Sequence, residues 1–482
     1  MSTTDPEFSA TRAAAAGTNH WYLSASPILR ALVHLCVPMA AAMIVGAIYN
    51  VINAGFIGSL HDATLLAAIT LGTPLLALVM AVGGVFGTGG GALVSRLLGE
   101  AESDPAKAQG IKHVSSFALW GAALVGLILG GIGLLLLDPL VSLLGADAAA
   151  APATRAFTAV TLLFVPVLSA AFCLEQLVRA EGAARQVMTG IIISTASNVV
   201  FDVLFILGLH WGVAGAALAV GLSNLVLVAY FATWLHRHSE HVRLAPRWFT
   251  LSPAVLKPVL GIGVSELLQA GFLIVTSLVL NNLAAAYGDG PLAAMGVAVR
   301  IAQVPEFLLM GITLGVLPLL AYSYGKGDRS RLLAALRTSG IAVGVIALIF
   351  AVPAVAFREQ IVSFFLPDSS LLLLGATILT AQLVAMIANG FTGLLTSFFQ
   401  ATGRILPATV MSITQGVLFV PIVLLGNLWF GLDGIIWALT VTEVAVLLAG
   451  ILMWLVFRSA IDRGLAEGSP QRADDVLAQM DA

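Results

Sequence analysis

The sequence predicts an all-α polytopic membrane protein, with twelve transmembrane helices in two six-helix lobes. Of its 482 residues, 59% are hydrophobic and only 10% are charged, and the mean hydropathy is +1.01. One soluble core cannot hide that much apolar surface. Apolar runs long enough to cross a hydrocarbon layer of about 30 Å, which takes roughly 20 helical residues, recur along nearly the whole chain.

These runs are long and apolar on all sides, whereas barrel strands would be short segments of alternating hydrophobicity. Helices are therefore predicted throughout. In chain order, we expect them at residues 31–58, 64–97, 113–137, 155–179, 187–209, 213–235, 253–287, 291–323, 336–357, 371–401, 405–426 and 432–457.

The two halves of the chain repeat one another. Gly99 corresponds to Gly325, and the Arg-Ala-Glu-Gly of residues 179–182 is echoed by the Gln-Ala-Thr-Gly of residues 400–403. A duplicated six-helix unit explains the shared order. Because six is an even number, the two lobes keep one orientation and are related by a pseudo-two-fold axis along the membrane normal. A cavity between such lobes is the expected substrate path.

Positive charges gather in the tails and the even-numbered loops, whereas Arg155 and Arg358 are nearly alone in the odd-numbered ones. By the positive-inside rule we expect both termini in the cytoplasm, and a multi-pass location in a bacterial cytoplasmic (inner) membrane.

Cys36 and Cys173 lie inside expected spans, so we interpret them as small core residues without a disulfide.

A charged segment after the sixth span marks the boundary between the halves. The resulting division is a cytoplasmic N-terminal tail (1–27), an N-lobe (28–235), a cytoplasmic linker (236–252), a C-lobe (253–457) and a cytoplasmic C-terminal tail (458–482).

Ionisable groups at membrane depth are costly and need a partner, a wet cavity or a function. Asp202 lies well inside the fifth span, four residues after Asn198, so the two side chains share one helix face. They could share a proton or bind a small cation, although a structural partner on another helix is an alternative. Asp202 is the first candidate for an ion-coupling site. Glu175 precedes Arg179 by four residues, which suits a helical ion pair.

The second half offers a less specific set of polar groups. Glu266 and Gln269 lie in the seventh span, and Glu306 lies in the eighth, six positions after Arg300. We consider these four residues and Tyr49 as substrate-binding candidates, with structural pairing as the alternative. Glu443 could equally be a protonated packing residue. No metal-ligand cluster and no nucleophile–base pair stands out, so we expect no enzyme, no metal and no cofactor.

Several motifs resemble those of the multidrug and toxic compound extrusion (MATE) transporters, over about residues 28–457. They are Tyr-Asn-Val-Ile-Asn (49–53), Arg-Leu-Leu-Gly (96–99), Arg-Ala-Glu-Gly (179–182), Asn-Val-Val-Phe-Asp (198–202), Gly-Val-Ala-Gly-Ala-Ala (212–217) and Tyr-Ser-Tyr-Gly (322–325). The resemblance implies two six-helix bundles around a V-shaped cleft, and export of organic compounds in exchange for protons or sodium ions. The Asn198-to-Asp202 motif is similar to that of the DinF-like branch, whose N-lobe carboxylates handle the coupling ion.

Two departures from the family pattern bear on the ion. Asn53 stands where an aspartate is common, and Val220 stands where a threonine often lies. Both changes weaken a sodium site of hard oxygen ligands, whereas protonation needs one carboxylate and a water path. We therefore favour H+ over Na+, with Asp202 as carrier and Asn198 and Asn53 as neighbours. The glutamate that another branch keeps in the seventh span would fall nearer Gly271 than Glu266, so the resemblance transfers no C-lobe site.

The leading hypothesis is a monomeric antiporter that exports cationic or hydrophobic drug-like molecules through the lipid bilayer, with no role for nucleic acid. A sodium-coupled drug antiporter is one alternative. A flippase for a lipid-linked or amphiphilic substrate is another, but Arg300 is the only clear cation in mid-span, which argues against a pyrophosphate path. A sensor on the same scaffold and a membrane enzyme are more distant alternatives.

Overall fold

The computed structural model describes residues 16–58, 63–145, 149–365 and 371–467. In this part of the chain, twelve helices are long and apolar enough to span a membrane, and no strand occurs. The all-α prediction with twelve spans is therefore confirmed. The N-terminal set is α2 (Ile28–Gly58), α3 (Ala63–Glu100), α4 (Ala108–Leu135), α6 (Ala151–Ala180), α7 (Ala184–Asp202) and α8 (Gly212–His238).

The C-terminal set is α9 (Pro253–Ala285), α10 (Asp289–Gly325), α11 (Arg329–Ala356), α13 (Leu372–Ala401), α14 (Ile405–Phe430) and α15 (Leu432–Glu467). Shorter helices are α1 (Asn19–Ser24), α5 (Leu137–Leu143) and α12 (Arg358–Phe365). Helix α5 follows α4 and helix α12 follows α11, so these two short helices occupy equivalent positions in the two repeats. Both cysteines are buried and free.

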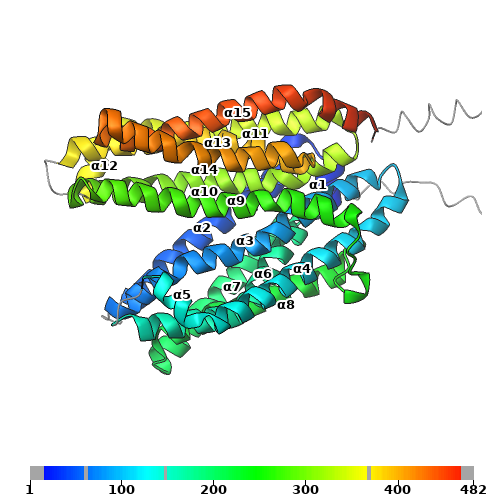
Figure 1. The fold of residues 1–482 in the computed structure, drawn as a ribbon. Coiled ribbons are helices and arrows are strands. Elements are labelled where there is room, and N and C mark those ends of the chain that lie inside the picture. The colour runs from blue at the N-terminus through cyan, green and yellow to red at the C-terminus, as the bar shows by residue number, and fades with distance from the viewer. Residues whose placement is uncertain (1–15, 59–62, 146–148, 366–370, 468–482) are drawn as a thin grey trace, which may run out of the picture.

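The two sets form two lobes that diverge from one end of the molecule (Figure 1). Helices α3 to α8 lie in one lobe and α9 to α15 in the other. The lobes approach one another at the end where α1 and the segment between α8 and α9 lie, which we call the closed end. They separate toward the end where α5 and α12 lie. At the closed end, the segment between α8 and α9 is fixed to α4, because Ser116 and Trp120 donate hydrogen bonds to the carbonyls of Ala245 and Leu244.

Glycines allow the lobes to touch backbone to backbone. A β-carbon on Gly99 of α3 would overlap the carbonyl oxygen of Tyr322 on α10, and one on Gly325 of α10 would overlap that of Arg96 on α3. The two contacts are repeat equivalents of one another. The α2–α10 crossing is similar, since a β-carbon on Gly315 would lie 2.7 Å from the Cys36 Cα. Close approach of this kind compensates for the weak hydrophobic drive between helices in lipid.

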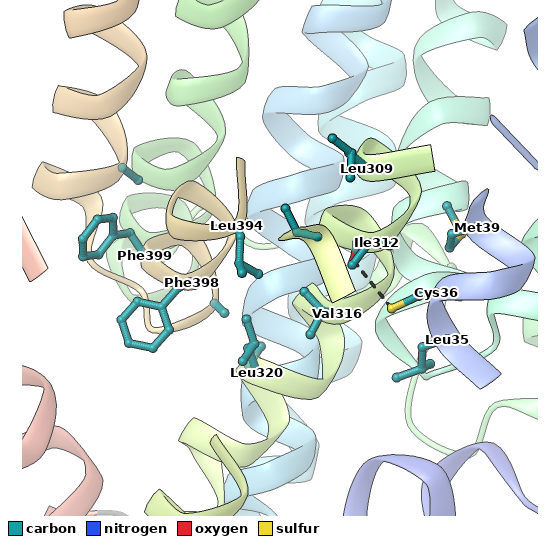
Figure 2. Close-up of a cluster of buried hydrophobic side chains, with 14 of the residues drawn as sticks. Leu35, Cys36, Met39, Leu309, Ile312, Val316, Leu320, Leu394, Phe398 and Phe399 are labelled. Carbon is teal, nitrogen blue, oxygen red and sulfur yellow. Dashed lines mark hydrogen bonds between the residues drawn. The ribbon is translucent and has the colours of Figure 1, made fainter. Parts of the chain in front are cut away.

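Apolar side chains fill the space beside the α2–α10 crossing (Figure 2). Leu35 and Met39 of α2 pack against α10, which in turn packs on Phe398 and Phe399 of α13. The Cys36 thiol donates to the Ile312 carbonyl at 3.6 Å. The first membrane-spanning helix, α2, therefore belongs to the contact between the lobes as well as to its own lobe.

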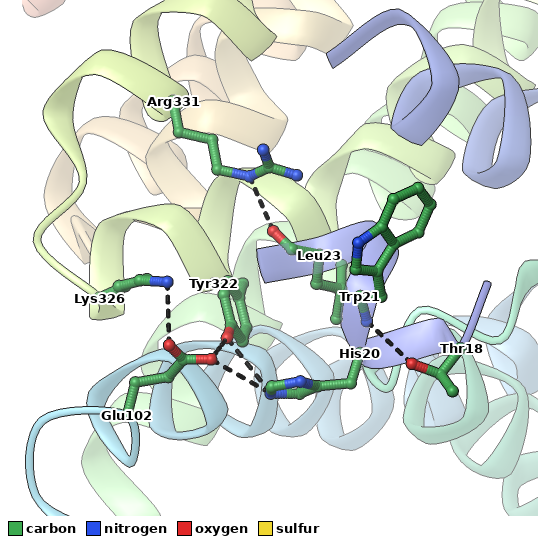
Figure 3. A network of polar contacts seen from close by, with 8 residues as sticks. All are labelled: Thr18, His20, Trp21, Leu23, Glu102, Tyr322, Lys326 and Arg331. Atoms are coloured by element: carbon green, nitrogen blue, oxygen red, sulfur yellow. Dashed lines mark hydrogen bonds and ion pairs between the residues drawn. The ribbon is translucent and has the colours of Figure 1, made fainter. Parts of the chain in front are cut away.

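A polar network ties the lobes at the closed end (Figure 3). Glu102, just after α3, lies 2.9 Å from the Lys326 ammonium and 3.4 Å from the His20 Nε2, and it accepts a hydrogen bond from the Tyr322 hydroxyl. Burial opposes ionisation of Glu102, but Tyr322 and Lys326 outweigh it and hold its pKa below the usual value. Arg331 holds the end of α1 by donating to the carbonyls of Tyr22, Leu23 and Ser26.

Exchange of Glu102 for Gln will weaken the closed end. A carboxylate whose pKa is depressed stabilises the folded state above its unfolded value near 4.5, and the contribution is lost as pH falls through the folded pKa. We expect Glu102→Gln to cost up to about 1 kcal/mol at pH 7, and to lengthen the distance between spin labels on Ala106→Cys and Ser330→Cys.

The matched control is Asp462→Asn, which breaks the Arg329–Asp462 pair between α11 and α15, within one lobe. It should leave the label distance unchanged. Equal distance distributions for Glu102→Gln and the control would contradict a role of Glu102 in joining the lobes.

The loop between α6 and α7 holds a second, partly buried acid. Gly182 has a φ of +77°, which a glycine adopts without strain. The Ser95 hydroxyl donates to the Ala180 carbonyl at 2.8 Å, and Ser239 donates to the Glu181 carboxylate. Burial raises the pKa of Glu181 to about 7, against the opposing effect of the Ser239 hydrogen bond.

Glu181 makes stability depend on pH. Because its folded pKa is raised, its contribution is fully present below the unfolded value near 4.5 and is lost as pH rises through about 7. Glu181→Gln keeps the acceptor for Ser239 without the charge. It should raise the free energy of unfolding at pH 8 by up to about 3 kcal/mol, with little change at pH 5. Thermal unfolding at both pH values measures this; the exposed control Glu359→Gln should show no such difference, and a variant that gains nothing at pH 8 would contradict the assignment.

Candidate functional site

Asp202 lies at the end of α7, where the helix changes its hydrogen-bonding pattern. The next residues, Val203–Gly208, form a π-helical turn, a feature that is frequent at functional sites. The chain then turns sharply into α8, with positive φ values at His210 and Gly212. Asp202 and Asn198 are only 1% and 3% exposed. The sequence prediction that they share one buried helix face is consistent with this geometry.

The neighbours of Asn198 come from α8. The Asn198 Nδ2 donates to the Ser223 hydroxyl at 3.4 Å, and that hydroxyl donates to the Val220 carbonyl at 2.9 Å. Asn224 also donates to the Val220 carbonyl, at 2.9 Å. Val220 stands where the family often has a threonine, so its side chain offers no oxygen. The Ser223 hydroxyl supplies an oxygen in the same neighbourhood. Sequence reasoning missed Ser223, although it follows Val220 by less than one helical turn.

Two buried acceptors at this position lack a hydrogen-bond donor. The Asn198 Oδ1 and the Asp202 Oδ2 have no hydrogen-bond partner in the described part of the chain. Buried polar atoms in native proteins are almost always satisfied, so an unsatisfied pair calls for an explanation. A proton or a small cation would supply what both oxygens lack.

Helix α2 packs against α7 beside this site. Tyr49 is half-buried, and the Asp202 carboxylate acts electrostatically on its hydroxyl, which places the two groups near one another. Asn53, one helical turn further along α2, is also half-buried. Helices α2, α7 and α8 thus build the site that we call the N-lobe pocket, made by Tyr49, Asn198, Asp202 and Ser223.

Glu266 lies in a different place, at the junction of the two lobes. Its carboxylate accepts a hydrogen bond of 3.0 Å from Gln400 of α13, which also donates to the Ser265 hydroxyl at 3.2 Å. The charge of Arg179, on α6 of the other lobe, acts on Glu266. Arg179 lies 4.0 Å from Glu175, the helical pair that the sequence predicts. Glu266 is therefore hydrogen-bonded within its own lobe and lies within the electrostatic influence of an arginine of the other lobe.

The remaining C-lobe candidates divide into paired and exposed groups. Glu306 accepts a hydrogen bond of 3.0 Å from Asn389, and Glu443 accepts one of 2.6 Å from Gln415. Glu306 and Glu443 act on one another electrostatically. Arg300 and Gln269 are exposed and make no ion pair or hydrogen bond within the described residues. The partners Gln400, Asn389 and Gln415 had no signal in the sequence beyond being polar residues at membrane depth.

Loss of the hydrogen-bond donor to Glu266 should lower the free energy of unfolding. Gln400→Leu removes the donor to Glu266 and leaves a buried carboxylate without it, so we expect a loss of about 1–3 kcal/mol in the free energy of unfolding. The control Thr396→Ala, on the same helix, removes a hydroxyl that bonds only its own helix, to the Thr392 carbonyl. Thermal unfolding of both variants tests this; a loss for Gln400→Leu no larger than that of the control would contradict it.

Comparison with known proteins reveals extensive similarity. The MatE family model matches residues 38–204 and 262–425. The multidrug export protein MepA of Staphylococcus aureus (strain MRSA252) is 31% identical over 441 residues, covering 92% of this chain and 96% of MepA. MepA of Staphylococcus saprophyticus is 32% identical over 447 residues, covering 93% and 98%.

Solved structures agree with the two-lobe fold. A crystal structure of MATE in complex with MaL6 superposes with a TM-score of 0.84 at 22% identity, covering 92% of this chain and 99% of that one. An outward-facing conformation of a multidrug resistance MATE family transporter gives 0.83 at 22% identity, with the same coverage. At this identity the solved structures establish the fold alone.

Proposed function

Because this chain belongs to the multidrug and toxic compound extrusion (MATE) family, we propose that it exports organic cationic or hydrophobic small molecules in exchange for protons. Family membership makes it a multidrug efflux transporter rather than an enzyme. The observation that carries the coupling proposal is the N-lobe pocket, in which a buried carboxylate and a buried carboxamide each have an oxygen without a donor.

The proton acts at Asp202. An ionised carboxylate at this depth is costly without a partner, so it attracts either a proton or a cationic molecule. Protonation removes the charge and lets the carboxyl group donate a hydrogen bond, for which Asn198 offers a free acceptor. Proton and cationic substrate then disfavour one another at the pocket, which is the thermodynamic basis of exchange. Tyr49 and Asn53 are the polar groups of α2 that adjust to the change.

The donor set favours H+ over Na+. The Val220 side chain carries no oxygen, and its carbonyl already accepts hydrogen bonds from Ser223 and Asn224. Asn53 supplies an amide where a carboxylate would strengthen a cation site. A sodium ion prefers several hard oxygen ligands, and this pocket offers one carboxylate.

We place the closed end in the cytoplasm, together with both termini. Basic residues gather there, including Arg331 and Lys326 of the network around Glu102, which agrees with the positive-inside rule. The conformation is then outward-facing, in a bacterial cytoplasmic membrane. Since one chain carries both lobes, we propose that a monomer suffices.

The C-lobe contributes contacts to the substrate. Glu306, Gln269 and Arg300 are exposed, so their polar groups are open to a bound molecule. Glu266 is a candidate of another kind, since Gln400 already donates a hydrogen bond to it and the charge of Arg179 acts on it; it would respond to the substrate through the lobe junction.

Ethidium export from proteoliposomes, driven by an imposed proton or sodium gradient, tests the proposal. We expect a proton gradient to drive export by the wild type, and Asp202→Asn to reduce the initial rate at least about tenfold, as is common for loss of a proton-transfer group. The control Asp433→Asn removes an exposed carboxylate from the first turn of α15 and should export normally.

The other outcomes are equally clear. Export driven by sodium alone would overturn proton coupling, and full proton dependence in Asp202→Asn would exclude Asp202 as the carrier. If neither gradient moves ethidium, a lipid or amphiphile becomes the favoured substrate, or a sensor the favoured function.

A further inference from the structure

A second cavity lies on the N-lobe, at the closed end. It has a volume of about 520 Å³ and lies between α2 and α7, beside α1. Arg185, in its wall, lies 17 residues before Asp202 on α7, which is about 25 Å along a helix. The cavity is therefore separate from the N-lobe pocket.

The mouth of the cavity is positively charged. Arg30 and Arg185 line it, and both are exposed. Neither forms an ion pair with a carboxylate in the part of the chain that the structure describes. Arg30 lies 6.0 Å from the ring of Trp21 on α1. No acidic residue is among the lining groups. The two guanidinium charges at the cavity therefore have no carboxylate beside them and could bind an anion.

A buried histidine also lines the cavity. His34 is 7% exposed, and neither of its ring nitrogens has a hydrogen-bond partner. The Gly182 carbonyl lies near the ring but outside hydrogen-bonding geometry. The ring stacks on Tyr22 at 3.7 Å between centroids. A nitrogen of this ring is available to a ligand that enters the cavity.

The α2 side of the cavity beyond Arg30 is largely apolar. Val33 and Val37 of α2 are 54% and 57% exposed, and Pro38 and Ala41 of the same helix also line the cavity, opposite Met188 and Thr189 of α7. The α2 residues follow Arg30 along the chain, so this helix presents a cation first and an apolar strip after it. Basic pockets between helices at a membrane surface, continued by apolar surface, match the two parts of an anionic phospholipid.

We propose that this cavity binds an anionic phospholipid, with the phosphodiester between Arg30 and Arg185 and an acyl chain along Val33, Val37 and Ala41. The lipid belongs to the leaflet at the closed end, which is the inner leaflet in the orientation proposed above. Bound there, it joins α1, α2 and α7. The proposal does not depend on the coupling ion or the exported substrate.

Native mass spectrometry of the purified full chain tests this with phosphatidylglycerol, phosphatidylcholine and inorganic phosphate as probes. We expect the wild type to retain phosphatidylglycerol in preference to phosphatidylcholine. A basic residue near a membrane surface contributes about fivefold in affinity, so Arg30→Gln with Arg185→Gln should weaken retention roughly 25-fold. The control, Arg237→Gln with Arg458→Gln, removes two exposed arginines outside the cavity and should retain the lipid normally.

A second variant keeps the test independent of the arginines. Ala41→Phe fills the apolar wall, leaves both charges, and should also lower phosphatidylglycerol retention. Equal loss in the control pair would overturn the proposal, because general surface charge would then explain binding. Equal retention of the two lipids, or displacement of phosphatidylglycerol by millimolar phosphate, would overturn it as well. Since retention is measured without transport, failure of the export experiment leaves this result unaffected.

Discussion

The relative position of the two lobes depends on helix crossings that only glycine permits. Gly99 and Gly325 bring the backbones of α3 and α10 into contact, and Gly311 and Gly315 do the same for α10 and α2. In lipid there is little hydrophobic drive to bring helices together, so stability comes from close packing and from satisfied polar groups. A side chain at any of these positions would separate the lobes at the closed end. The network around Glu102 adds polar contacts to the same junction.

The acids at membrane depth differ in their hydrogen-bond partners. Glu266, Glu306 and Glu443 each accept a hydrogen bond from an amide on another helix, so each contributes to holding the C-lobe together. Asp202 differs, because no hydrogen bond to its carboxylate occurs within the described residues, whereas Glu443, whose Oε2 atom also lacks a donor, is bonded through its Oε1 atom. In a medium that penalises unsatisfied groups, the Asp202 carboxylate lies without a donor beside a π-helical turn. That contrast, more than the presence of an acid at membrane depth, separates the coupling candidate from the others.

The twelve membrane-spanning helices could be predicted from the sequence, because length and hydrophobicity decide whether a segment crosses a membrane. The sequence could not foresee the π-helical turn after Asp202 or the extension of α15 to Glu467, since neither changes the hydropathy pattern. In the site, the four-residue spacing was enough to put Asn198 and Asp202 on one face. The partners Ser223 and Gln400 were missed because helix rotations, which are set by packing between helices, decide which polar groups meet.

Helix α2 connects the candidate coupling site to the junction between the lobes. Its Tyr49 lies within the electrostatic influence of Asp202, and its Cys36 and Ala40 contact Gly315 and Gly311 of α10. Pro38 lies between those two contacts and cannot donate to the His34 carbonyl, so α2 lacks a backbone hydrogen bond at the crossing. Helix α2 bends most easily at Pro38. If a change in charge at Asp202 moves Tyr49, the displacement therefore acts on a helix that can bend at its crossing with α10. Because Cys36 and Ala40 flank Pro38, a bend there shifts the α2–α10 crossing itself. The proposed lipid cavity, lined by His34 and Pro38, adjoins the same turn, so a lipid bound there would contact α2 close to its crossing with α10.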